Sequence, residues 1–186
     1  VLAAIGAEIT FVMLRPSPID PPSSTTTYVM SVKEAITFFQ GLGGKAGEAT
    51  LIVSYRIPLE RANQIVLSQK TALREVNAHA IVNMTSDTVW ATAGGEPSNS
   101  YIQTASLVFG GISDAPWPAG RTEAFLNGLG RPLTTEDLTE SLAILEREVR
   151  QELEKWASFR AKLPDDGFSD DYRVTLALSL FYKALI

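Results

Sequence analysis

Runs of apolar and β-branched residues, separated by clusters of glycine, proline and small polar residues, predict four strands. These runs cover Glu8–Leu14, Thr50–Pro58, Ala80–Ala91 and Tyr101–Ile112. The second, TLIVSYRIP, predicts a buried strand that ends at Pro58, because proline has no backbone donor for a sheet. The last two flank AGGEPSNS, whose Gly, Pro, Asn and Ser content predicts a hairpin loop longer than two residues.

Turn-forming residues dominate two segments between these strands. Pro16–Thr27 is rich in Pro, Ser and Thr, and we expect an exposed excursion there because these residues favour turns over regular structure. GLGGKAG, which follows the segment Val32–Gln40, predicts a flexible turn. A boundary between two subdomains is expected after Pro58.

Helical signals replace the strand pattern in the last third of the chain. AGRTEAFLNGLG predicts a short helix stopped by glycines. Thr134 precedes a longer helix and has Asp137 at the third position, a weaker form of the capping box. That helix carries one apolar stripe, formed by Leu138, Leu142, Leu145, Val149, Leu153 and Trp156. Glu146 and Arg150 are spaced for a supporting ion pair.

A final helix is predicted after LPDDGFSDD. Ser169 is expected to cap it, with Asp170 and Asp171 in the first turn, where acidic side chains interact favourably with the helix dipole. The helix itself, YRVTLALSLFYKALI, is apolar on nearly every side. A helix of this kind is expected to be buried, either in this domain or against a neighbour.

Composition narrows the function classes. The chain has 186 residues, 45% of them hydrophobic, which is enough for one core or for one domain plus part of another. A net charge of −5 and the lack of a Lys/Arg run argue against nucleic acid as a partner. The absence of cysteine excludes disulfides and thiolate metal sites within the chain. With no membrane-spanning run and no signal peptide pattern, we expect a cytoplasmic protein, and the first residue, Val1, suggests a segment of a larger chain.

Motifs that could carry chemistry are weak. GLGGKAG lacks the first glycine of a phosphate loop, and Ala46 replaces the hydroxyl that would hold magnesium. DDGFSDD lacks the spacing of a calcium loop, and a helix stop followed by a cap explains it better. His79 has no partner at metal-ligand spacing, so a structural role is favoured, and the sequon at Asn83 receives no role. The residue pattern alone therefore predicts an α+β domain and no catalytic residues.

Ordered stretches of the chain resemble the flavin domain of xanthine dehydrogenases and aldehyde oxidases, including the carbon monoxide dehydrogenase flavoprotein C-terminal subdomain. VLAAIGAEITFV is similar to the strand after the family's second flavin-binding loop, and ITFFQG to its TFF segment. LIVSYRIP resembles the family's ILLSIEIP, and LSQKTALRE resembles FKQASRRE. ASLVFGGI resembles the strand that ends in GG, and DYRVTLALSLFYKAL the closing helix YRRTLTLSFFFKFYL.

The resemblance implies two flavin-contacting residues. Ile52 lies where the family places an aliphatic residue against the isoalloxazine ring, a role that dispersion contacts fulfil. Lys70, twelve residues after Pro58, lies where the family has a lysine at the flavin, and a cation there stabilises negative charge on the reduced ring. Without the resemblance, Ile52 would be taken as a core strand residue and Lys70 as a solvated surface lysine.

The segment Arg74–Asn77 resembles the start of a family loop beside the flavin that influences access of NAD. Glu75 and Val76 stand where the xanthine dehydrogenase loop has a basic and an acidic residue, and Asn77 replaces an acid. A carboxylate beside the ring changes the local potential, so these departures leave both NAD and oxygen open as the electron acceptor.

The resemblance implies an α+β fold in which residues 1–58 are the remnant of an FAD-binding subdomain. Residues 59–186 would form a C-terminal subdomain with a small antiparallel sheet packed by helices. The family's main FAD-binding loops would precede Val1, so this chain would form one wall of the flavin site and be inactive alone. Iron-sulfur clusters and molybdopterin are expected on other parts of the enzyme, which oxidises xanthine or aldehydes, and a homodimer is expected.

Two alternatives stay open at this stage. The first is a descendant of the flavin domain that has become a structural or interaction module and binds no FAD. The second is a separate flavoprotein subunit of a bacterial-type hydroxylase, with its molybdenum and iron-sulfur parts on other chains.

Overall fold

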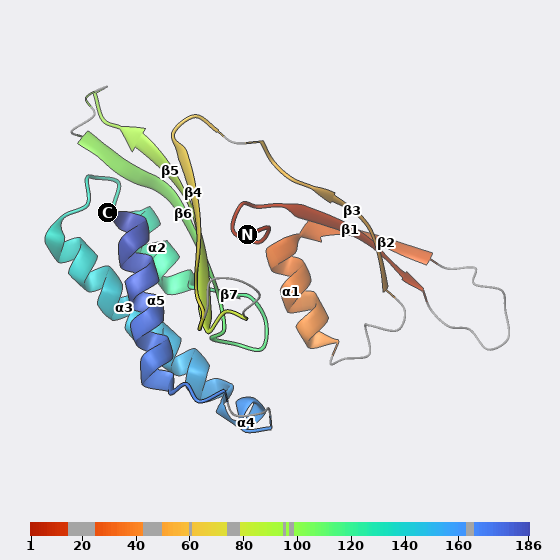
Figure 1. Cartoon of the computed structure of the whole chain (residues 1–186). Helices are drawn as coiled ribbons and strands as arrows, with labels where there is room; N and C mark the ends of the chain where they lie inside the picture. The colour runs from red at the N-terminus through yellow and green to blue at the C-terminus, as the bar shows by residue number, and fades with distance from the viewer. Residues whose placement is uncertain are drawn as a thin grey trace, which may run out of the picture. The chain divides into compact units, whose positions relative to one another are not determined.

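The computed structural model describes residues 1–14, 25–42, 50–59, 61–73, 79–94, 96, 99–162 and 166–186. The chain divides into two compact units, Leu2–Leu59 and Glu60–Ile186, the latter together with Val1 (Figure 1). Each unit has its own hydrophobic cluster.

The unit Leu2–Leu59 contains a three-stranded antiparallel sheet of order β2-β1-β3 and one helix. The elements are β1 (Glu8–Leu14), β2 (Thr25–Ser31), α1 (Val32–Gly41) and β3 (Thr50–Arg56). Alternate residues of β1 face α1, and Ile9 and Phe11 pack there with Ala35. Ser31 and Glu34 form a reciprocal capping box that fixes where the chain turns from β2 into α1.

The sequence expectations for this unit were only partly right. Strand Glu8–Leu14 is confirmed. The exposed excursion Pro16–Thr27 is wrong at its end, because β2 begins at Thr25 and pairs with β1, and residues 15–24 lie outside the described part. The turn at GLGGKAG falls mostly outside it too, from residue 43 onward.

The strand expected over Thr50–Pro58 exists as β3, but it is not buried. It is an edge strand that pairs only with β1 among the described strands, and every residue from Leu51 to Leu59 is exposed. An apolar composition indicates that burial of the strand would be favourable. Whether the strand is buried depends on which other elements pack against it. In the described part of Leu2–Leu59, no element buries the side chains of β3 in the way that α1 buries Phe11.

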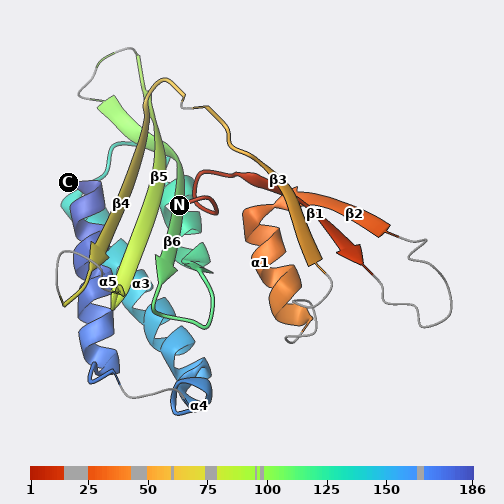
Figure 2. The same ribbon diagram turned by 45° about the vertical axis from the view of Figure 1, so that its right-hand side comes forward.

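The unit Glu60–Ile186 is built on a four-stranded antiparallel sheet of order β4-β5-β6-β7. Its strands are β4 (Gln64–Thr71), β5 (Val82–Thr92), β6 (Ser100–Gly110) and β7 (Trp117–Pro118). Helices α2 (Gly120–Gly128), α3 (Thr135–Lys155) and α5 (Asp170–Leu185) cover one face of the sheet (Figure 2). The short α4 (Ala157–Arg160) follows α3. The core lies between sheet and helices.

Most of the local expectations for this unit are confirmed. Strands β5 and β6 form the predicted antiparallel hairpin, and α2 is the predicted short helix. Thr134 and Asp137 form a complete capping box at α3, and Leu145, Val149 and Leu153 of its stripe are buried. Ser169 caps α5 through the amide of Tyr172, and Arg150 bonds Glu146 at 3.0 Å. The predicted α+β fold, with a small antiparallel sheet packed by helices, is thus confirmed.

Helix α5 is buried along one side within its own unit, and its other side is exposed. Val174, Ala177 and Phe181 are buried against the sheet and α3, but Tyr172 and Tyr182 are each 42% exposed. Tyrosine can stay at a surface because its hydroxyl prefers water while its ring covers apolar neighbours. The helix is therefore amphipathic, and its exposed side carries Thr175 and Ser179 as well as the two tyrosines.

Strand β4 was not foreseen from the sequence. Its apolar residues, such as Ile65 and Val66, fall on both faces of the strand, so no clean alternation marks it. Its place in the sheet is fixed by eight paired positions along β5, from Gln64↔Val89 to Thr71↔Val82.

Among the described helices, none is long and apolar enough to cross a membrane.

Candidate functional site

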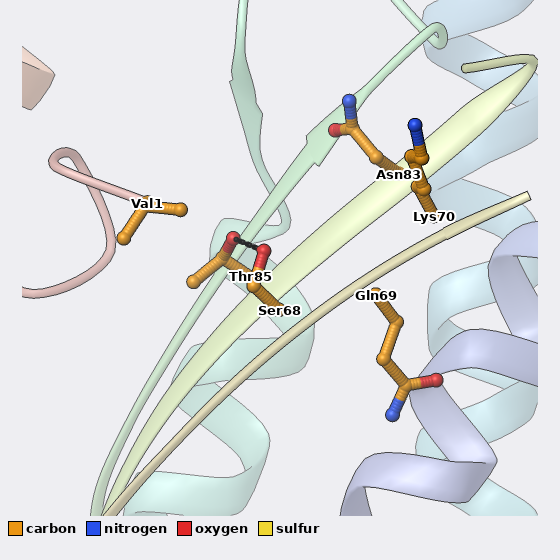
Figure 3. Close-up of a pocket in the computed structure, with 6 residues that line it drawn as sticks. All are labelled: Val1, Ser68, Gln69, Lys70, Asn83 and Thr85. Carbon is orange, nitrogen blue, oxygen red and sulfur yellow. Dashed lines mark hydrogen bonds between the residues drawn. The ribbon is translucent and has the colours of Figure 1, made fainter. Parts of the chain in front are cut away.

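Lys70 lies near the end of β4, on the sheet face opposite the helices. Its partner in the ladder is Asn83 of β5, and two positions along, Ser68 pairs with Thr85. Partners in an antiparallel ladder project from the same face, so these four side chains line one hollow, together with Val1 and Gln69. Figure 3 shows Lys70 and Asn83 beside each other and Gln69 turned to the opposite face. The Oγ of Ser68 and the Oγ1 of Thr85 are 3.1 Å apart in a hydrogen bond.

The charge around the hollow is positive. Lys70 is exposed, and within the part of the chain that the structure describes it forms no ion pair. The acid that shares this face of β5, Asp87, lies four residues from Asn83, or about 13 Å at the rise of a strand. Asp87 accepts a hydrogen bond from the Nε2 of Gln64 at 2.7 Å. The side chains that line the hollow therefore offer a ligand one cation, Lys70, together with neutral polar groups.

A residue of a third strand, β6, lies beside Lys70 and Asn83 and forms a row of three residues with them across the sheet. Asn83 pairs with Gly110 of β6, so Lys70, Asn83 and Gly110 lie side by side on three neighbouring strands. The amide of Asn83 occupies the space that a side chain at position 110 would need. A Cβ built on Gly110 would lie 2.4 Å from the Oδ1 of Asn83.

Arg173 of α5 fixes the strand ends beside this row. Its Nη1 donates to the carbonyl oxygens of Ile81 at 2.8 Å and of Gly111 at 2.9 Å, and its Nη2 bonds the carboxylate of Asp166. The side chain is buried, and a buried guanidinium needs such partners to offset its lost hydration. Arg173 therefore ties the start of β5 and the end of β6 to the closing helix.

A carboxylate from α3 positions α2 against β6. The N-cap of α2, Ala119, has no side chain that could accept from the free amides, and Glu148 of α3 replaces it. Glu148 accepts from the amide nitrogens of Arg121 at 2.7 Å and of Thr122 at 2.9 Å, and from the Thr122 hydroxyl at 2.6 Å. This contact supports the sheet from its helical side.

Ile52 lies in the other compact unit, on β3. It pairs with Phe11 of β1 and projects from the same face, but it is 49% exposed whereas Phe11 is fully buried. Its chain neighbours Leu51 and Val53 are 61% and 58% exposed. Ile52 is thus an accessible aliphatic side chain and not a core residue. Lys70 and Ile52 belong to different compact units.

Two other positions singled out from the sequence add little to the site. Residues 74–78, which include Glu75, Val76 and Asn77, lie outside the described residues. His79 is exposed and lies before β5. No cluster of three or more His, Cys, Asp or Glu able to hold a metal occurs among the described residues.

Sequence reasoning missed Asn83 as a site residue. It was considered only as part of a sequon, and nothing in its local pattern shows that it faces Lys70. The signal that could have found it is the strand pairing of β4, because a predicted ladder would have placed Lys70 opposite Asn83.

Solved structures with the same fold include CO dehydrogenases and a quinoline oxidoreductase. CO dehydrogenase from Oligotropha carboxidovorans matches with a TM-score of 0.63 and 17% identity over 98% of this chain and 52% of that chain. CO dehydrogenase from Hydrogenophaga pseudoflava matches with a TM-score of 0.61 and 14% identity over 98% and 52%. Quinoline 2-oxidoreductase from Pseudomonas putida 86 gives 0.61 and 16% over 99% and 52%. At such identities the likeness shows the fold alone.

The chain spans about half the length, 52%, of these solved chains. No curated protein matches its sequence significantly. The model of the CO dehydrogenase flavoprotein C-terminal domain matches residues 68–186, which include Lys70, Asn83, Gly110 and Arg173. The resemblance inferred from the sequence is thereby confirmed, and the proteins of this family are flavoproteins that bind FAD. The chain belongs to the CO dehydrogenase flavoprotein C-terminal domain family.

Proposed function

We propose that this chain forms one wall of the FAD site in a molybdenum-containing oxidoreductase. The observation that carries the proposal is Lys70, an exposed cation without an ion-pair partner among the described residues, beside a polar hollow within the family-matched segment. In this proposal residues 1–58 are the end of the FAD-binding subdomain and residues 59–186 its C-terminal subdomain.

The donor set of the hollow fits a flavin. Bound FAD would supply electron transfer through its isoalloxazine ring, which gains electron density on reduction. Lys70 would hold its ammonium where it stabilises that charge, and the neutral groups of Asn83, Ser68 and Thr85 would offer hydrogen bonds without opposing it. A carboxylate in the same place would disfavour the reduced ring.

Ile52 would supply an aliphatic contact. Its half-exposed side chain on β3 is free to pack against a planar ring, and such burial is favoured by loss of apolar surface from water. Leu51 and Val53 beside it are exposed as well, so β3 offers a larger apolar surface than one residue alone.

The remaining features of the complete protein belong to the same proposal. Electrons would reach FAD from iron-sulfur clusters, which receive them from a molybdopterin centre, both on other domains or on separate subunits. The substrate would be a purine such as xanthine or an aldehyde, and the acceptor NAD or oxygen. A homodimer and a cytoplasmic location complete the proposal.

One observation favours a second candidate function. The exposed aliphatic residues of β3 would also suit a protein interface, as expected for a structural or interaction module without FAD. Purified full-length protein separates the two, because only the flavin site predicts the visible absorbance of FAD at one FAD per chain.

A lysine substitution tests the role of Lys70. In Lys70→Ala, we expect the bound flavin to be reduced about tenfold more slowly, since the ring loses a cation that stabilises its reduced state. Lys70→Arg should retain most of the rate. Lys183→Ala removes another exposed lysine, on α5, and is the matched control. Absence of flavin in the wild type, with assembly intact, would favour the interaction module.

A further inference from the structure

We infer that Asn83 is a second ring-binding residue of the FAD site, and that Gly110 is required to keep its amide in place. The inference rests on the proposed function, because it assigns further residues to the same hollow. It is carried by the row Lys70, Asn83, Gly110 across three strands.

The Asn83 amide points toward the space that Lys70 faces. Asn83 is the direct ladder partner of Lys70, and both side chains leave the same sheet face. Figure 3 shows the amide nitrogen of Asn83 and the ammonium of Lys70 pointing toward the same side of the view. Two nitrogen donors next to each other, one charged and one neutral, suit an oxygen or nitrogen acceptor that becomes more negative on reduction.

Gly110 leaves the room in which this amide lies. The Asn83 side chain lies over the backbone of Gly110, with its Oδ1, Cγ and Nδ2 at 2.4, 3.0 and 3.1 Å from where a Cβ would be. Any residue other than glycine would expel the amide from this position. Gly110 does not have a left-handed φ, so its backbone imposes no need for glycine. The space taken by Asn83 is the physical reason for glycine at this position.

The neutral charge of Asn83 has an electrostatic consequence. A neutral amide beside Lys70 leaves the cation available to a ligand, whereas an acid at position 83 would pair with it. An asparagine therefore preserves the positive charge of the hollow and adds a donor.

The experiment is a double-mutant cycle on FAD affinity in the full-length protein. Apoprotein is titrated with FAD, and binding is followed by the change in flavin fluorescence, which does not depend on enzyme turnover. The variants are Asn83→Ala, Gly110→Ala and the double variant, with Gln103→Ala as control, because Gln103 is an exposed amide of β6 that does not line the hollow.

We expect Asn83→Ala and Gly110→Ala each to weaken FAD binding about tenfold, the effect of one lost hydrogen bond. In the double variant the methyl group added at position 110 fits the space left by the amide. Its affinity should also fall about tenfold, not about a hundredfold, because both changes remove the same contact. Gln103→Ala should bind FAD as the wild type does.

The outcomes separate this inference from the proposed function. Wild-type protein that binds no FAD overturns the proposed function and this inference with it. Wild-type protein that binds FAD, together with an Asn83→Ala variant of unchanged affinity, overturns only the role of Asn83. A double variant weakened about a hundredfold would show that Gly110 acts independently of Asn83, and would overturn its role as the residue that makes room for the amide.

Discussion

Alanine at Gly111 is expected to destabilise the protein far more than alanine at the neighbouring Gly110. Gly111 has a φ of +84°, in the left-handed region that costs other residues about 1–2 kcal/mol. A Cβ there would lie 2.1 Å from the carbonyl oxygen of Ile81, a backbone atom that cannot rotate away. Strand β5 would have to shift at its start.

The expected loss of unfolding free energy follows from the hydrogen bond that this shift of β5 would break. The Ile81 carbonyl accepts from the buried Arg173 at 2.8 Å, and a hydrogen bond to a charged group contributes about 1.5–3 kcal/mol. Together with the backbone strain, Gly111→Ala should cost about 3–5 kcal/mol of unfolding free energy. For a chain of this size that corresponds to a melting temperature lowered by about 10 °C.

The assay is thermal unfolding followed by circular dichroism, with Gly110→Ala as the matched control. At Gly110 the added Cβ meets only the end of the Asn83 side chain, which can rotate, so the loss should stay below about 1 kcal/mol. Equal losses in the two variants, or a Gly111→Ala variant as stable as the wild type, would refute this explanation of the two glycines.

Two further substitutions test the contacts that support the site. Glu148→Gln replaces one of two acceptor oxygens with an NH2 group, which faces a donor in either orientation, the Arg121 amide or the Thr122 groups. It should lower the unfolding free energy in a urea titration by about 2 kcal/mol, and an unchanged midpoint would contradict the capping role. Hydrogen bonds from Arg131 and the Thr134 amide lower the pKa of Asp137 well below its usual 3.8. The resulting stabilisation is complete above about pH 4 and is lost as the pH falls toward the lowered folded value. Asp137→Asn should therefore show a shallower fall of melting temperature between about pH 5 and 2, and a slope equal to the wild type would contradict it.

Features with a local cause were predictable from the sequence. The capping box at Thr134, the cap at Ser169 and the hairpin of β5 and β6 each depend on residues a few positions apart, and each is confirmed. Local chemistry can decide these features because the groups that satisfy one another are close in the chain.

Features that depend on distant partners were not predictable. The cap of α2 comes from Glu148, and the edge of β6 is closed by Glu123 and Asn127, which accept from the amides of Leu107 and Ala105 at 2.6 Å each. No spacing rule connects these residues to their partners. For the same reason Lys70 was found only by resemblance to a family, and Asn83 could be found only from the pairing of β4 with β5.

The wrong expectation of burial has a physical cause. Apolar content predicted a buried strand at β3, but the structure exposes Ile52. A hydrophobic side chain is more stable out of water, but the fold determines which side chains are covered by another element.

The proposed FAD site is tested most directly by the FAD content of the purified full-length protein, with Lys70→Ala beside it. We predict one FAD per chain in the wild type and slower flavin reduction in the variant, with normal rates in Lys183→Ala. A wild-type protein that assembles normally without flavin, or a Lys70→Ala variant whose flavin is reduced at the wild-type rate, would contradict the proposal.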